Sequence, residues 1–433
     1  MVPKFVVQGG QRLNGRVRPA GNKNAALPML AAALLTEEEV ILENVPEIRD
    51  VKTLMELMEG LGVEVGWIDR NVVRIQAREI RPRELDPESA ASIRASILLA
   101  GPMLARTGEM QLPQPGGDII GRRRMDTHFL ALEALGATFG ERCGIFGLHA
   151  ESGLHGARIF LDEPSVTATE NAVMAASLAK GTTLLRNAAA EPHVQDLCSM
   201  LSGMGCQISG AGTGSLEIEG ATRLRGGRFR ISSDHIEVGS FIALAAVTRG
   251  EILIEDAAPH FLDSTLIGFS RLGVQAEIRG EDVFISGDQE LKIRMDLGGH
   301  IPKIDDGPWP AFPADLTSIA LVAATQCEGT ILIHEKMFES RMFFTDKLLG
   351  MGARIILCDP HRVVVVGPSK LRGGIVESPD IRAGMALLIA ALGAEGQSEI
   401  YNIGQIERGY ERIDERLRAL GARIERGDSR EDD

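Results

Sequence analysis

The segment DVKTLMELMEGLGV, residues 50–63, decides how the chain is organised. Its apolar residues return at the spacing of one helical face: Val51, Leu54, Met58 and Leu61. Asp50 is placed to cap the start of this helix, and Gly62 suits the left-handed residue that ends one. A short β-like run, residues 63–67, follows. The pattern predicts an amphipathic helix that is closed by glycine and followed by a strand.

The closing tag of this segment recurs five more times along the chain, as Leu135-Gly136-Ala137, Met204-Gly205-Cys206, Leu272-Gly273-Val274, Met351-Gly352-Ala353 and Leu420-Gly421-Ala422. Successive tag glycines lie 74, 69, 68, 79 and 69 residues apart, which indicates six similar units. Asp126, Asp196 and Asp263 are expected to open the equivalent helices of three other units.

A second, more apolar helix precedes the amphipathic one in each unit. In the first unit it is expected over residues 24–35, followed by a turn and a strand over residues 39–45. Its many small residues suit a helix packed closely on its neighbours. Six such units could form a solenoid or close into two groups of three, and the periodicity alone does not decide. The unequal unit lengths favour two closed domains.

Composition narrows the functional classes. The chain has 433 residues, of which 44 % are hydrophobic and 24 % charged, and its net charge is -14. That charge argues against generic binding of nucleic acid or anionic membranes, so an anionic ligand needs a local arginine cluster. Five cysteines without a CxxC pair indicate a reducing compartment and no structural zinc. With neither a signal-peptide pattern nor a long apolar run, we expect a cytoplasmic protein without a membrane span.

Three segments could carry chemistry. Lys23 and Asn24 stand at the start of an apolar helix, where exposed N–H groups favour anions, although a simple asparagine cap beside a solvated lysine explains them equally well. Residues 112–128 combine a Pro-Gly-Gly-Asp turn with three consecutive arginines, which suits either a mobile lid over an anion or an ordinary loop. Residues 306–315 form a proline-rich loop that places Asp315 at a helix start, where capping is the commoner role.

Single arginines recur near the same point of several units: Arg94, Arg341, Arg382 and Arg408. In a repeated fold, equivalent helix ends point towards a common axis, so these side chains predict a pocket for two or more anionic groups. The sequence contains no Walker loop, HExxH or GxSxG motif, which disfavours kinases, zinc proteases and serine hydrolases.

Together these segments resemble the enolpyruvyl transferase family over nearly the whole chain, and most closely its branch that acts on a nucleotide sugar. The signatures are Lys23-Asn24-Ala-Ala-Leu, Arg94-Ala-Ser, Pro115-Gly-Gly-Asp-Ile-Ile-Gly-Arg-Arg, Pro310-Ala-Phe-Pro-Ala-Asp315, Phe338-Glu-Ser-Arg341, Asp380-Ile-Arg382 and Glu407-Arg-Gly-Tyr-Glu-Arg412. Each is weak alone, but seven in order are strong.

The resemblance implies an α/β fold of two inside-out α/β barrel domains, each built from three repeated β/α units. One domain would span residues 23–232 and carry the mobile loop. The other would combine residues 1–22 with 233–433. Helix N-termini would face an interdomain cleft that closes on substrate.

The resemblance also implies a reaction. The enolpyruvyl group of phosphoenolpyruvate would pass to the 3′-hydroxyl of UDP-N-acetylglucosamine with release of phosphate, the first committed step of peptidoglycan synthesis. The family's catalytic positions correspond to Lys23, Asp118, Asp315 and Arg408, with Asp315 as the base near the acceptor hydroxyl. No metal or organic cofactor is implied.

The family's binding positions can be carried over in the same way. Those for phosphoenolpyruvate correspond to Lys23, Asn24, Arg94, Arg123, Arg341, Arg382 and Arg408. Those for the nucleotide sugar correspond to Asn24, Arg94, Arg123, Arg124, Met125, Asp126, Thr127, Ser165, Val166, Thr167, Asp315 and Met337.

The chain departs from the family pattern at several positions. Asp118 stands where most relatives carry a reactive cysteine; a carboxylic acid there can donate a proton to C3 or chiefly assist product release. It is a poorer target than a thiolate for an epoxide, so we expect resistance to fosfomycin. Gln114-Pro115 is an insertion, and Arg124, Glu163 and His193 replace a usual proline, lysine and glutamate. These changes affect the expected nucleotide contacts more than the reaction.

Three other functions remain compatible with the sequence. The acceptor could be shikimate 3-phosphate, although the Pro-Gly-Gly-Asp lid and the Arg-Gly-Tyr-Glu ending favour the nucleotide-sugar branch. It could be another nucleotide, given Arg124 and Glu163. The chain could also be a binding paralogue without activity, against which the retention of Lys23, Asp315 and Arg408 argues.

Overall fold

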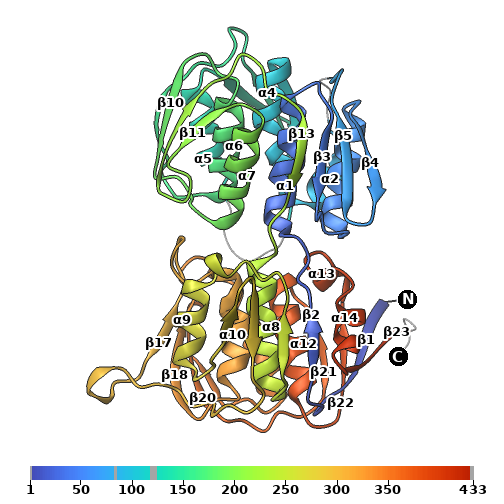
Figure 1. Cartoon of the computed structure of the whole chain (residues 1–433), viewed down its shortest axis with the longest axis vertical. Helices are drawn as coiled ribbons and strands as arrows, with labels where there is room; N and C mark the ends of the chain where they lie inside the picture. The colour runs from blue at the N-terminus through green and yellow to red at the C-terminus, as the bar shows by residue number, and fades with distance from the viewer. Residues whose placement is uncertain (1, 82–84, 118–123, 430–433) are drawn as a thin grey trace. The chain divides into compact units, whose positions relative to one another are not determined.

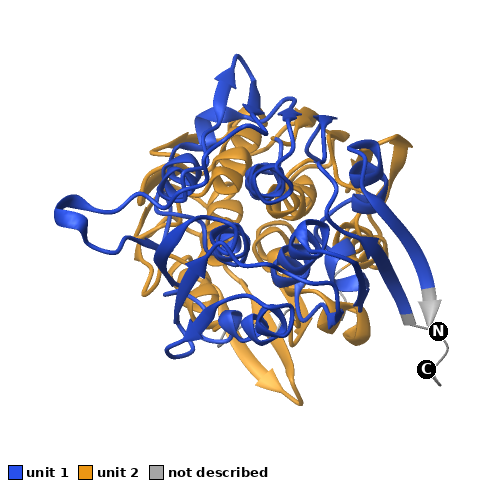
Figure 2. Ribbon diagram, turned by 90° about the horizontal axis from the view of Figure 1, so that it is seen from below, with its two compact units in different colours: residues 1–20, 119–122, 233–433 blue, residues 21–118, 123–232 orange. Residues whose placement is uncertain are grey.

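A computed structural model describes residues 2–81, 85–117 and 124–429 (Figure 1). Within these ranges, residues 2–20 and 233–429 form one unit, and residues 21–117 and 124–232 form the other (Figure 2). We call them unit 1 and unit 2. Each unit has its own aliphatic core. That of unit 1 is drawn from residues 5–17 and 236–424, and that of unit 2 from residues 25–231.

The helices of unit 2 follow the expected alternation of a buried helix and a half-exposed one. The buried helices are α1 (Lys23–Ala32), α4 (Ala100–Thr107) and α6 (Val166–Ala176), extended by the 3-10 turns η1 (Ala33–Leu35) and η2 (Arg94–Leu99). The others are α2 (Arg49–Gly60), α3 (Pro87–Ser92), α5 (Asp126–Ala134) and α7 (Pro192–Gly203).

Unit 1 repeats this arrangement. Its buried helices are α8 (His235–Thr248), α10 (Thr317–Ala324) and α12 (Ile381–Gly393), which contact one another. The more exposed helices are α9 (Asp263–Arg271), α11 (Thr345–Gly350), α13 (Gly404–Glu407) and α14 (Ile413–Ala419). Short 3-10 turns are η3 (Pro259–Phe261), η4 (Leu297–Gly299), η5 (Ala314–Leu316) and η6 (Arg341–Phe344).

The strands described in unit 2 form three sheets, with orders β13-β3-β5-β4, β6-β8-β7 and β11-β12-β10-β9. Their bounds are β3 Val40–Glu43, β4 Glu64–Asp69, β5 Val72–Gln76, β6 Glu109–Pro113, β7 Thr138–Arg142, β8 Ile145–His149, β9 Arg158–Phe160, β10 Thr182–Arg186, β11 Gln207–Ser209, β12 Ser215–Glu219 and β13 Gly227–Arg230.

The strands described in unit 1 also form three sheets, with orders β21-β22-β1-β23, β15-β16-β14-β2 and β17-β18-β20-β19. Their bounds are β1 Val2–Gln8, β2 Gly15–Val17, β14 Ile252–Ile254, β15 Glu277–Arg279, β16 Asp282–Ile285, β17 Lys303–Asp305, β18 Gly329–His334, β19 Ile355–Leu357, β20 Arg362–Gly367, β21 Ile375–Glu377, β22 Gln397–Tyr401 and β23 Arg423–Ser429.

Both units place helices inside and sheets outside. All residues of α8 are buried, whereas α9 buries only Thr265, Gly268 and Phe269. In the view of Figure 2, helices occupy the middle of each unit and strands lie around them. The expected class, two inside-out α/β domains of three repeated units each, is therefore confirmed, and the solenoid alternative is wrong.

The six tag glycines all adopt the left-handed backbone that the sequence predicted. Their φ angles are 91° at Gly62, 103° at Gly136, 108° at Gly205, 81° at Gly273, 99° at Gly352 and 98° at Gly421. Each follows the last turn of the more exposed helix of its repeat. The tag therefore ends a helix at six places in the chain. Glycine is favoured there because a residue with a side chain adopts this conformation only at a cost.

Two expected helix caps are wrong. Helix α2 begins at Arg49 after Ile48, which makes no side-chain capping bond, and Asp50 lies inside the first turn. Asp196 lies within α7, which begins earlier at Pro192, and its carboxylate accepts hydrogen bonds from the Ser232 backbone and hydroxyl. Both carboxylates have other partners, and proline is favoured at the first helical position. Asp126 and Asp263 do open α5 and α9.

None of the helices in the described ranges combines the length and the apolar character that a bilayer-spanning segment needs.

Candidate active site

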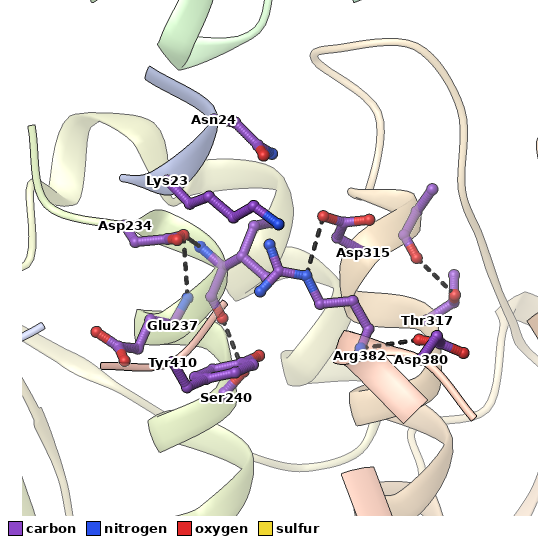
Figure 3. Close-up of polar contacts among 12 residues, drawn as sticks. Lys23, Asn24, Asp234, Glu237, Ser240, Asp315, Thr317, Asp380, Arg382 and Tyr410 are labelled. Atoms are coloured by element: carbon purple, nitrogen blue, oxygen red, sulfur yellow. Dashed lines mark hydrogen bonds and ion pairs between the residues drawn. The ribbon is translucent and has the colours of Figure 1, made fainter. Parts of the chain in front are cut away.

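Asp315 is held between two buried arginines in unit 1. It lies in η5, directly before α10. Its Oδ1 accepts a hydrogen bond from Arg341 Nη1 at 3.0 Å. Its Oδ2 accepts one from Arg382 Nε, also at 3.0 Å (Figure 3). The two arginine side chains are 3 % and 6 % exposed, but that of Asp315 is 28 % exposed. The carboxylate is thus the part of this triplet that solvent reaches most.

Local structure fixes both arginines. Asp380 caps α12 by accepting hydrogen bonds from the backbone N–H groups of Arg382 at 2.8 Å and Ala383 at 3.0 Å. This places Arg382 in the first turn of α12, with its guanidinium carbon 5.4 Å from the ring centre of Tyr410. Arg341 begins η6, and its Nη1 also donates to the Ala314 carbonyl at 2.8 Å.

Each of the two arginines has one side-chain nitrogen that no described residue satisfies. Within the described residues, Nη1 of Arg382 and Nε of Arg341 are buried and have no hydrogen-bond partner. Buried polar atoms are nearly always satisfied, and an unsatisfied charged one is costly. Glu335 Oε2 lies 4.0 Å from Arg341 Nε, beyond hydrogen-bond distance, and Asp315 is the carboxylate that both guanidinium groups contact. The arrangement therefore suits a further anion with several acceptor oxygens, such as a carboxylate or a phosphate.

The charges of the triplet reinforce one another. Burial on its own raises the pKa of Asp315, but Arg382 and Arg341 outweigh it and hold that pKa well below its usual range. Burial lowers the pKa of Arg382, and Asp315 more than restores it. All three groups are therefore charged over the whole working pH range. In this arrangement Asp315 is a weak base.

Further residues surround Arg382 in unit 1. Asp234 caps α8 through the N–H groups of Ile236 and Glu237, and burial raises the pKa of its carboxyl while Arg382 opposes that rise. The Tyr410 hydroxyl lies 2.9 Å from Ser240 Oγ, and burial raises the pKa of this phenol (Figure 3). Arg408, expected at the same site, follows α13 and donates from Nη1 to Gln405 Oε1 at 3.0 Å.

Met337, an expected sugar contact, stands on a loop that two buried carboxyl groups hold. Asp306 accepts hydrogen bonds from the backbone N–H groups of Lys336 at 2.5 Å and Met337 at 3.3 Å. Glu335 Oε1 accepts one from the Phe338 N–H at 3.2 Å. The Met337 side chain itself is 39 % exposed. The loop leads directly into Arg341, so these carboxyl groups position both.

In unit 2, Lys23 is neither solvated nor beside a capping Asn24. The cap of α1 is Asn22, whose side chain accepts a hydrogen bond from the Asn24 N–H at 2.9 Å. The Lys23 side chain is 10 % exposed, and its Nζ lies 2.7 Å from Asp50 Oδ2. An ion pair this buried is a strong reason for Asp50 to sit inside α2 rather than cap it.

The expected nucleotide-sugar residues of unit 2 form one polar cluster. Arg94 donates from Nη2 to the Arg124 carbonyl at 2.8 Å. The Arg124 guanidinium pairs with Asp126 at 3.1 Å and with Asp162 at 3.0 Å. The Thr127 hydroxyl donates to Asp162 Oδ1 at 2.7 Å and, with Arg124, lowers the pKa of that carboxyl. Met125 directly precedes α5, which begins at Asp126.

The segment of Ser165, Val166 and Thr167 starts α6. Ser165 is its cap and accepts a hydrogen bond from the Ala168 N–H at 3.4 Å. The Thr167 hydroxyl lies 3.1 Å from Nε2 of His128 on α5. Asp118 and Arg123, which the sequence assigned to the site, lie outside the described residues.

Several site residues were missed from the sequence. Asp50 was noticed, but as a cap, because its partner Lys23 is distant along the chain. Asp306 and His128 fall inside segments that were singled out, yet nothing in their spacing revealed a role. Asp162 gave no signal, since its partners Thr127 and Arg124 come from another repeat. Glu335 gave none either, although its partners Thr317 and Phe338 lie in its own repeat. Among the described residues, no group of three or more His, Cys, Asp or Glu side chains is placed to hold a metal ion.

The fold is that of an enolpyruvyl transferase. The chain belongs to the EPSP synthase (3-phosphoshikimate 1-carboxyvinyltransferase) family, whose model matches residues 7–417. It is similar to proteins named UDP-N-acetylglucosamine 1-carboxyvinyltransferase from Bradyrhizobium diazoefficiens (59 % identical over 425 residues, covering 98 % of each chain) and Treponema denticola (56 % over 422 residues, covering 98 % of this chain and 99 % of the relative).

Solved structures show the same fold at low identity. The enolpyruvyl transferase NikO from Streptomyces tendae superposes with a TM-score of 0.86 at 23 % identity, covering 99 % of this chain and all of that one. An EPSP synthase from Acinetobacter baumannii gives a TM-score of 0.77 at 17 % identity, with the same coverage. At these identities the likeness concerns the fold alone.

Proposed function

We propose that this chain transfers the enolpyruvyl group of phosphoenolpyruvate to the 3′-hydroxyl of UDP-N-acetylglucosamine and releases phosphate. One observation carries this assignment. Relatives named UDP-N-acetylglucosamine 1-carboxyvinyltransferase match the chain at 49–59 % identity over nearly their full lengths. The two named substrates would be its small-molecule partners, the reaction would be the first committed step of peptidoglycan synthesis, and the cytoplasm would be its compartment.

Arginines and one lysine would hold phosphoenolpyruvate. Arg341 and Arg382 each offer a buried, unpartnered nitrogen, and a carboxylate or phosphate supplies the acceptors that these nitrogens lack. By family likeness Lys23, Asn24, Arg94, Arg123 and Arg408 would complete the site. The nucleotide sugar would lie along Arg124, Met125, Asp126, Thr127, Ser165, Val166 and Thr167, with Met337 at the sugar.

The reaction has two halves that balance. The acceptor oxygen bonds to C2 of phosphoenolpyruvate and gives up its proton, while C3 gains a proton and becomes a methyl group. The resulting tetrahedral intermediate then loses the C3 proton and phosphate, which restores the double bond. Asp118 is the proposed acid at C3, and Asp315 the proposed base at the acceptor hydroxyl.

The Asp315 triplet suggests how that base is switched on. While Arg341 and Arg382 are both bonded to Asp315, the pKa of that carboxyl stays too low for it to take a proton from a hydroxyl. An incoming anion competes for the same guanidinium groups and adds negative charge nearby. Both effects raise the pKa of Asp315, since a like charge disfavours the ionised form. The base would therefore gain strength when phosphoenolpyruvate is bound.

One assay tests the assignment against its rivals. Phosphate release from phosphoenolpyruvate is measured with UDP-N-acetylglucosamine, UMP or shikimate 3-phosphate as the acceptor. Release with the nucleotide sugar alone is expected. Release only with another acceptor would overturn the substrate assignment, and release with none would favour a binding paralogue without activity.

A further inference from the structure

His128 is a buried histidine next to the proposed nucleotide-sugar segment. It lies on α5 and is 1 % exposed. Its two ring nitrogens contact two side chains of α6: Nδ1 lies 2.9 Å from Asn171 Nδ2, and Nε2 lies 3.1 Å from Thr167 Oγ1. The proposed mechanism gives this histidine no role.

The hydrogen-bond partners of Asn171 fix the orientation of its amide. Its Oδ1 accepts from the Gly101 N–H at 2.9 Å, and its Nδ2 donates to the Ile97 carbonyl at 2.8 Å. A backbone N–H can only donate and a carbonyl can only accept, so the amide cannot be reversed. The two helices also approach closely here, since a Cβ on Gly101 would stand 2.6 Å from the backbone oxygen of Asn171 and 3.0 Å from its Oδ1.

This orientation settles the tautomer of His128. The atom facing Nδ1 is an N–H donor, so Nδ1 must be the acceptor and carries no proton. Burial, and secondarily the charge of Arg94, lowers the pKa of His128 to about 3, so the ring is neutral at working pH. The proton of the neutral ring therefore sits on Nε2, which donates to Thr167 Oγ1.

The hydrogen bond from His128 leaves the Thr167 hydroxyl to act as a donor. Its oxygen receives the Nε2–H of His128, so its own hydrogen must point to another acceptor. Within the described part of the chain, His128 is the one side-chain partner of this hydroxyl. Thr167 is partly exposed in the first turn of α6, where the helix dipole favours negative charge.

We propose that His128 is a positioning residue that fixes the Thr167 hydroxyl as a hydrogen-bond donor to an acceptor oxygen of the nucleotide. This inference rests on the proposed function, because that function places a nucleotide sugar at Ser165 to Thr167. The acceptor is either a phosphate oxygen or a uracil carbonyl, and both present the same chemistry to the hydroxyl.

Two matched variants separate positioning from packing. Glutamine at position 128 keeps an N–H near the place of Nε2, whereas asparagine keeps a polar atom only near the place of Nδ1. We expect His128→Asn to raise the KM for UDP-N-acetylglucosamine roughly tenfold with little change in kcat or in the KM for phosphoenolpyruvate. His128→Gln should restore most of this loss, and the effect should not change between pH 6 and 9.

A double-mutant cycle gives the decisive outcome. Thr167→Val removes the hydroxyl and keeps the shape, so it should raise the same KM as much as His128→Asn does. In the Thr167→Val background, His128→Asn should then add nothing. Additive effects, or equal losses in the asparagine and glutamine variants, would overturn the proposal and leave His128 a packing residue.

Binding of smaller ligands identifies the acceptor and isolates the inference. Calorimetry with UDP, UMP and uridine on the wild type, Thr167→Val and His128→Asn should show that both variants bind every ligand that contains the acceptor more weakly than the wild type does. A loss for UDP and UMP but not uridine assigns a phosphate oxygen, and a loss for all three assigns uracil. If the wild type releases no phosphate with UDP-N-acetylglucosamine, the proposed function fails, yet these binding differences still decide the role of His128. Binding of all three ligands by His128→Asn as tightly as by the wild type overturns it.

Discussion

At the scale of single residues, the carboxylate of Asp315 is both a structural anion and the proposed base. An asparagine at position 315 would turn an N–H group, in place of an acceptor oxygen, towards one of the two arginine donors. We expect Asp315→Asn to lower kcat by about 10²–10⁴. Inorganic phosphate should also raise the melting temperature of the variant more than that of the wild type, because it would supply the missing anion.

The matched control for this change is Asp305→Asn. Asp305 pairs with Lys303 at 3.0 Å and also with Lys336, both near the surface of the same unit, where such pairs contribute little. The kcat of Asp305→Asn should stay within about twofold of the wild-type value. A fall of less than tenfold in Asp315→Asn would argue against Asp315 as the base.

Asp118 carries a prediction that comes from the sequence alone. A thiolate opens an epoxide far more readily than a carboxylic acid does. We therefore expect fosfomycin at stoichiometric amounts to leave the activity intact, and Asp118→Cys to become sensitive to it. Intact-mass measurement after incubation provides the readout. A covalent adduct on the wild-type chain would contradict the prediction.

At the scale of structural elements, the loop before Arg341 depends on a proton. The Thr317 hydroxyl lies 2.7 Å from the Ala314 carbonyl and 2.5 Å from Glu335 Oε2. It has one hydrogen and the carbonyl can only accept, so a proton on Glu335 satisfies both contacts. Burial raises the pKa of Glu335 to about 8, which Arg341 opposes and Asp306 supports.

The sign of the pH effect follows from this raised pKa. The unfolded chain loses the Glu335 proton near its ordinary pKa of about 4.3, whereas the folded chain keeps it up to about pH 8. The stability that this proton provides is complete at low pH and falls as the pH rises through that window. Glu335→Gln imitates the protonated acid. Relative to wild type it should gain up to ~1.4 kcal/mol of unfolding free energy per pH unit across the window.

Denaturant unfolding of Glu335→Gln and wild type from pH 4 to 9 measures this difference. The variant should also keep the wild-type KM for phosphoenolpyruvate at pH 7, because it preserves the loop that leads to Arg341. A stability difference that does not change with pH would show that Glu335 is ionised in the fold.

The helix-ending glycines offer a test of backbone strain. An added Cβ would meet nothing within 4 Å at Gly205 or at Gly60, so packing plays no part in either substitution. Gly205 has a φ of 108°, but Gly60 lies in α2. Gly205→Ala should lower the free energy of unfolding by about 1–2 kcal/mol, and Gly60→Ala should raise it by up to about 1 kcal/mol. Equal effects would mean that the left-handed turn relaxes without cost.

At the scale of the whole molecule, the repeat could be predicted because it is local. Each tag, each apolar helix and each following strand is specified within one stretch of sequence, so six units and their inside-out class followed from spacing and resemblance. Side-chain contacts between separate elements, within one repeat or between two, could not be predicted in this way. The Lys23–Asp50 pair, the grip of Arg341 and Arg382 on Asp315 and the His128–Asn171 contact join distant segments. Residue type gave candidates, and only the fold supplied their partners.

The sheet that contains β1 has a consequence for synthesis on the ribosome. Strand β1 lies between β22 and β23. Both edges of β1 therefore stay unpaired until β22 and β23 have been synthesised. Every residue of unit 2 has left the ribosome long before that point. Strand β1 is therefore synthesised before unit 2 but paired after it, and during that interval its exposed strand edges are open to wrong partners.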